Sequence, residues 1–138
     1  MRDMFRSTQI SDLTPLANWN VGNVTNMSYM LYLTQISDLT PIKDWNVGNV
    51  TDMDSMFRST QISDLTPLKD WNVGNVTDMS YMFYGIPTLT NSAAITGWDV
   101  SKVSDFGYMF GGTTPKTNLP IFTSRPGTWD ASGTYIPN

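Results

Sequence analysis

The 138-residue chain contains no cysteine and no histidine. Without cysteine it can form neither a disulfide framework nor a thiolate metal site, although this absence does not decide the compartment. The two absences together remove the commonest nucleophile, general base and metal ligands. We therefore expect a protein that is not an enzyme, with no catalytic residues, no metal site and no cofactor.

Charge and long apolar stretches are also scarce. Charged residues make up 14% of the chain, the net charge is −4, and the eight lysines and arginines are scattered. A nucleic-acid-binding protein would need a cluster of positive charge, so nucleic acid is not expected as a partner. Because no run of 18 apolar residues occurs, the sequence predicts no membrane span.

What the chain does contain is a repeat of 26 residues. Trp19, Trp45 and Trp71 stand 26 residues apart, and residues 4–29 and 56–81 are identical at 23 of 26 positions. The three differing pairs are Ala17/Lys69, Asn18/Asp70 and Asn26/Asp78. A fixed period of this length predicts a solenoid, in which each turn buries its apolar edge against its neighbours.

The repeat also predicts how the chain is divided. We expect a repeat solenoid over 1–112, with turns at about 4–29, 30–55, 56–81 and 82–108, and a cap or linker over 113–138 with a short hairpin at 127–136. The first five residues align with 27–31, so the chain begins inside a turn and resembles a fragment of a longer array. Such an open N-terminal turn is a candidate surface for self-association.

Within a turn, apolar spacing predicts two elements. Residues 33–42 read as a short strand that ends at a proline, and Val50, Met53, Met56 and Phe57 follow the spacing of one helix face. The predicted fold is therefore α/β, with one short parallel strand and one short helix per turn. The periodic tryptophans and methionines are expected in the core rather than on a binding surface.

The segments WNVGNVTDMSYMF (71–83) and WDVSKVSDFGYMF (98–110) resemble the repeat of BspA-type leucine-rich-repeat surface proteins of Gram-positive bacteria. The resemblance covers about residues 1–112. It implies a right-handed leucine-rich-repeat-like solenoid, an extracellular location on the bacterial cell surface with a cell-wall or lipid anchor outside this segment, and adhesion. It transfers no catalytic residues.

A polar ladder on the predicted strands is the candidate binding face, because repeat proteins commonly present such a surface to partners. Its members are Ser11, Asp12, Thr14, Ser37, Asp38, Thr40, Ser63, Asp64 and Thr66. A calcium ladder is disfavoured, since calcium requires six to eight oxygens per ion.

Two functions fit these observations. The first is a non-enzymatic adhesion module that binds an extracellular matrix protein, a mucin or another surface protein or glycoprotein. The alternative is a structural stalk that projects another domain from the cell wall, because nearly identical turns offer no localised site. A binder would also have a variable edge available, where Tyr32 and Leu33 replace Arg58 and Ser59 of the next turn.

Overall fold

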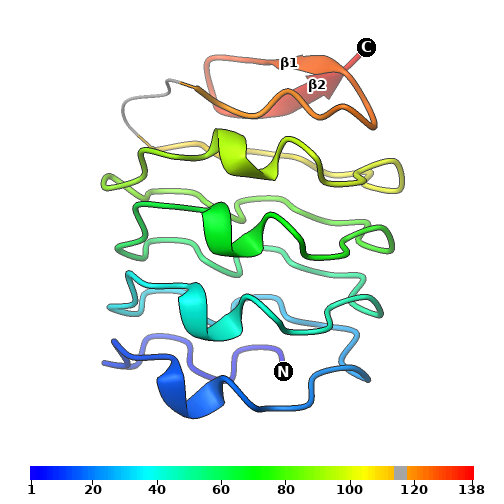
Figure 1. Cartoon of the computed structure of the whole chain (residues 1–138). Coiled ribbons are helices and arrows are strands. Elements are labelled where there is room, and N and C mark those ends of the chain that lie inside the picture. The colour runs from blue at the N-terminus through cyan, green and yellow to red at the C-terminus, as the bar shows by residue number, and fades with distance from the viewer. Residues whose placement is uncertain (114–117) are drawn as a thin grey trace.

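The computed structural model describes residues 1–113 and 118–138, and shows a stack of irregular turns closed at one end by a hairpin (Figure 1). Four 3-10 helices, one per turn, lie one above another on the face nearest the viewer. They are η1 (Thr14–Leu16), η2 (Thr40–Ile42), η3 (Thr66–Leu68) and η4 (Ala93–Ile95). The strands β1 (Gly127–Trp129) and β2 (Tyr135–Pro137) pair antiparallel beyond the last turn.

The predicted α/β leucine-rich-repeat solenoid is wrong. In the described residues there is no α-helix, and the only strands are β1 and β2. Parallel pairing between turns is confined to single bridging pairs. These are Asn26 with Asp52, Asp52 with Asp78, Asp64 with Asn91, and Asp78 with Asp105.

Left-handed residues explain why the predicted helix does not form. Ser55 and Ser59 have φ values of 55° and 58°, which an α-helix cannot accommodate. The segment is instead a chain of tight turns, and its amides bond to the next turn of the stack. Met53 N–H donates to the carbonyl of Asp78 at 3.0 Å, and Phe57 N–H donates to that of Met82 at 3.0 Å.

The predicted strand fails for a different reason. Pro41 does not end a strand but occupies the first turn of η2, where its fixed φ suits a helix and its missing N–H is not needed. Asp38 then accepts a hydrogen bond from the backbone N–H of Thr40 at 2.9 Å, which forms an Asx turn that leads into the helix. The same arrangement holds η1 and η3.

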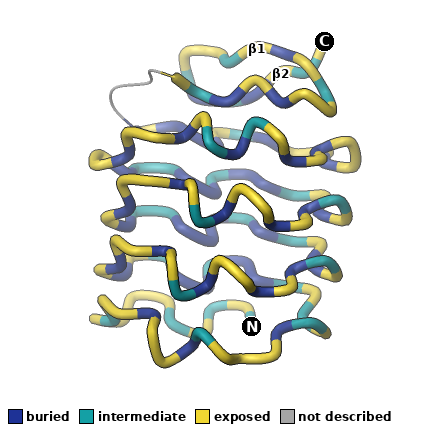
Figure 2. Tube along the Cα trace, viewed as in Figure 1, coloured by how far each residue is buried: buried dark blue, intermediate teal, exposed yellow. Residues whose placement is uncertain are grey.

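The core runs through the middle of the stack, with buried and exposed residues alternating along each turn (Figure 2). As predicted, the periodic methionines and three tryptophans lie in it. The indole N–H of Trp45, Trp71 and Trp98 donates to a carbonyl of the preceding turn at 2.9–3.1 Å. Trp19, in the first turn, is 40% exposed instead.

The C-terminal hairpin covers the last turn. Phe110 N–H donates to the carbonyl of Gly133 at 3.0 Å, and the Trp129 ring meets the Phe110 ring edge-on at 5.1 Å. Tyr135 is buried against Phe106. Residues 114–117 of the segment expected to form a cap or linker lie outside the described residues.

Candidate functional site

The nine residues of the predicted binding ladder all lie exposed along the edge that carries the 3-10 helices. They are not on strands, because no strand forms there. Thr14, Thr40 and Thr66 are instead the first residues of η1, η2 and η3.

Each aspartate of this ladder accepts a hydrogen bond from the threonine two residues later. Asp64 accepts hydrogen bonds from the Thr66 hydroxyl at 2.6 Å and the Thr66 backbone N–H at 2.8 Å. These two donors, the hydroxyl first, hold the pKa of Asp64 below its usual value. The corresponding threonines lower the pKa of Asp12 and Asp38 in the same way. The carboxylates therefore stay charged at neutral pH while one oxygen of each holds the turn that leads into a 3-10 helix.

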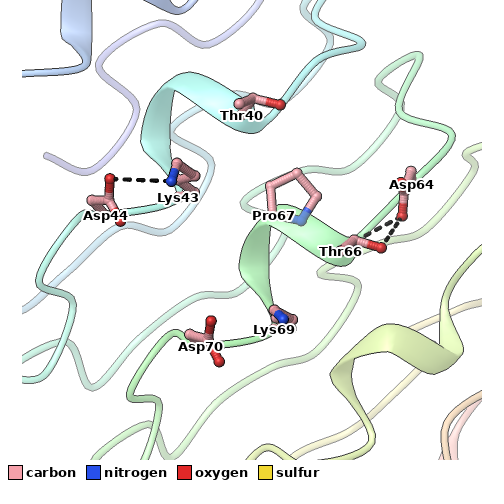
Figure 3. A pocket seen from close by; sticks show the side chains of 8 residues that line it. All are labelled: Thr40, Lys43, Asp44, Asp64, Thr66, Pro67, Lys69 and Asp70. Carbon is pink, nitrogen blue, oxygen red and sulfur yellow. Dashed lines mark hydrogen bonds and ion pairs between the residues drawn. The ribbon is translucent and has the colours of Figure 1, made fainter.

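Between η2 and η3 the surface is hollowed to a volume of about 380 Å³ (Figure 3). Its walls come from two successive turns and carry both charges. The lining residues are Thr40, Lys43, Asp44, Asp64, Thr66, Pro67, Lys69 and Asp70. Three of them, Thr40, Asp64 and Thr66, belong to the predicted ladder, which the structure thus brings to the rim of a hollow.

The charged side chains in the hollow form few and weak ion pairs with one another. The Lys43 ammonium lies 3.6 Å from the Asp44 carboxylate, and these side chains are 56% and 87% exposed. Lys69 and Asp70 form no ion pair with any residue of the described chain. Exposed ion pairs of this kind contribute little to stability, so both signs of charge remain available to a ligand.

The lysine–aspartate pairs are not among the predicted site residues, although the sequence carries a signal for them. Two of the three differences between residues 4–29 and 56–81 replace Ala17 and Asn18 by Lys69 and Asp70. Lys43 and Asp44 repeat the charged pair in the middle turn, whereas the fourth turn has Thr96 in place of the lysine. The charged hollow is therefore confined to two adjacent turns.

Within residues 1–113 and 118–138 no group of three or more acidic side chains is placed to hold a metal ion. None of the helices there has the length and apolar character to cross a bilayer.

Taken together, fold and site define a protein built of stacked 26-residue turns with a polar, two-turn hollow on its helical edge. The chain belongs to the family described as "Mycoplasma protein of unknown function, DUF285", whose model matches residues 1–131. Comparison with curated proteins and with solved structures gave no match.

Proposed function

We propose that this chain is a non-enzymatic binding module of a bacterial surface protein of the BspA type. It uses the helical edge to recognise an extracellular matrix protein, a mucin or another surface glycoprotein. The observation that carries the proposal is the hollow between η2 and η3, because its charged side chains come from only two turns. A localised site of mixed charge suits a protein surface with complementary charges.

The nine ladder residues extend this site along the edge. Ser37 and Asp38 continue it next to Thr40 of the hollow, and the copies of these residues in the first turn continue it further. Their exposure on consecutive turns gives a partner a polar surface beside the hollow. Because the carboxylates are already oriented by these hydrogen bonds to the threonines, a partner would not have to order them.

The matched test uses the chain's own first turn as the template. In the first turn, η1 is followed by Ala17 and Asn18. A fourfold variant gives turns two and three the same residues at these positions: Lys43→Ala, Asp44→Asn, Lys69→Ala and Asp70→Asn. Because η1 forms with those residues, the variant is expected to fold. Ala17→Lys with Asn18→Asp is the control, since it adds the same charges outside the hollow.

The assay measures binding of the purified chain to immobilised fibronectin, fibrinogen, collagen and mucin, with circular dichroism of every variant. Saturable binding that the fourfold variant loses and the control keeps would support the proposal. Equal binding by parent and fourfold variant would place the site elsewhere.

The second candidate function is a structural stalk. It is favoured by the near identity of turns one and three, and by the hydrogen bonds that join every turn to the next. A folded chain that binds none of the four surfaces would support the stalk.

Self-association is a separate proposal, and the exposed Trp19 on the first turn supports it. Sedimentation at rising protein concentration would detect it.

A further inference from the structure

A second surface, separate from the hollow, combines arginine and tyrosine side chains. The repeat position occupied by Arg6 carries Tyr32, Arg58 and Tyr84 in the following turns, so cation and aromatic ring alternate along the stack. The Arg58 guanidinium carbon lies 5.5 Å from the ring centre of Tyr32 in the preceding turn and 4.7 Å from that of Tyr84 in the next. It also lies 4.8 Å from the ring centre of Tyr81. We call Arg58 with these three tyrosines the arginine cradle.

The chain contains an internal comparison for this cradle. Arg6 lies over Tyr29 and Tyr32 at 4.9 and 5.3 Å, much as Arg58 lies over Tyr81 and Tyr84. Arg6, however, also forms an ion pair with Asp3 at 3.1 Å. The residue equivalent to Asp3 beside Arg58 is Ser55, and no carboxylate of the described chain pairs with Arg58.

Arg58 is therefore a cation without a counter-ion. Its Nε atom is buried and has no hydrogen-bond partner among the described residues. A buried donor without an acceptor costs free energy. A guanidinium can also bind a carboxylate, sulfate or phosphate through two parallel N–H groups, and the terminal nitrogens of Arg58 are the groups to do so. The chain has a net charge of −4, yet this guanidinium has no carboxylate beside it. It is therefore a candidate site for an anionic ligand.

The surroundings define the kind of anion. A nucleic acid or an anionic membrane needs several cations, and the cradle offers one. One charge flanked by partly exposed tyrosines suits a molecule with a single acidic group on an otherwise uncharged, hydroxyl-rich body. The rings supply flat apolar surface and each carries a phenolic O–H for hydrogen bonding. Tyr108, stacked on Tyr81 at 5.1 Å and 45% exposed, extends the surface.

We propose that the arginine cradle binds an acidic saccharide, with the carboxylate or sulfate of the sugar on Arg58 and the sugar ring against Tyr81, Tyr84 and Tyr108. This site shares no residue with the hollow between η2 and η3. It does not depend on that hollow binding a protein.

The test titrates the full chain with sialyllactose, which supplies a carboxylate, with a monosulfated lactose, and with neutral lactose, following tyrosine ring signals by NMR. Arg58→Tyr is the decisive variant, because tyrosine already occupies this position in the turns before and after. Arg6→Tyr is its matched control, since it removes the arginine that Asp3 neutralises. We expect binding of at least one acidic sugar, weakened at least about tenfold by Arg58→Tyr and unchanged by Arg6→Tyr.

Shifts of the Tyr81 and Tyr84 ring signals in the parent locate the site even if Arg58→Tyr fails to fold. The proposal is overturned if neither acidic sugar binds at about 10 mM, or if lactose binds equally well. It is also overturned if a short acidic peptide binds the cradle more tightly than either sugar, since the ligand would then be a protein.

Discussion

Replacing Trp71 by phenylalanine tests how much one turn of the stack stabilises its neighbour. Trp71 is 4% exposed, and its indole N–H donates to the carbonyl of Ile42 in the preceding turn at 3.1 Å. Trp19 occupies the same repeat position, yet it is 40% exposed. Trp19→Phe is therefore a control with the same chemistry and almost the same neighbouring sequence.

The expected loss follows from two contributions. The Ile42 carbonyl still accepts the Trp45 backbone N–H at 3.1 Å, so removing the indole does not leave it without a partner. The lost hydrogen bond then costs about 1 kcal/mol. The smaller ring leaves a void between two turns, which costs about 1 kcal/mol more. Trp71→Phe should thus destabilise the chain by about 2 kcal/mol, and Trp19→Phe by less than about 0.5 kcal/mol.

Urea unfolding followed by far-ultraviolet circular dichroism measures this difference without relying on tryptophan emission. With a slope of about 2 kcal/mol/M, the midpoint should fall by about 1 M for Trp71→Phe and hardly at all for Trp19→Phe. The slopes must agree between variants for the comparison to hold. Equal shifts for both variants would refute the reasoning, because they would show that the indole contact between turns contributes nothing measurable.

Three further changes test other parts of the stack. Met53→Asp should unfold the chain, because position 53 is fully buried and an unpaired charge there costs well over 4 kcal/mol; circular dichroism would show the loss, and a native spectrum would contradict it. Burial raises the pKa of Asp54, so the folded state binds the proton of this carboxyl more tightly than the unfolded state does. Asp54→Asn should therefore stabilise the chain at pH 7. The melting temperatures of variant and parent should converge as the pH falls below 3.8, the ordinary value for an aspartate. Gly133→Ala should loosen the hairpin, because φ is +83° there and the added methyl group would meet the backbone of Phe110 and Gly111. The Phe110 amide, which donates to the Gly133 carbonyl, should then exchange its hydrogen faster. Gly97→Ala, with nothing within 4 Å, should leave that amide unchanged.

The spacing of apolar residues predicted burial correctly but the backbone wrongly. Met53, Met56 and Phe57 were expected on one buried face, and all three are fully buried. An interval of three or four residues is also produced by consecutive tight turns, so the spacing alone cannot distinguish them from a helix. Ser55 and Ser59 decide the matter through their positive φ values, and serine carries no such signal in a sequence as glycine would.

The 3-10 helices of the helical edge could have been predicted from the sequence in place of a strand. An aspartate two residues before Thr-Pro is a pattern for an Asx turn, because its carboxylate can accept the threonine N–H. Asp38, Thr40 and Pro41 follow that pattern and form η2. The hollow itself could not be predicted, since it depends on the distance between successive turns.

The positions at which the turns differ bear on the choice between binder and stalk. An inward side chain touches the turn before and the turn after, so a change there must suit both; outward positions are free of that constraint. In a stalk, outward differences have no reason to gather. Here Lys69 and Asp70 lie together in the hollow, while Arg58 and Tyr81 lie together in the arginine cradle, 4.8 Å apart. These two groups of differences carry charge without a strong ion pair, so they are the ones that the two proposed binding surfaces would use.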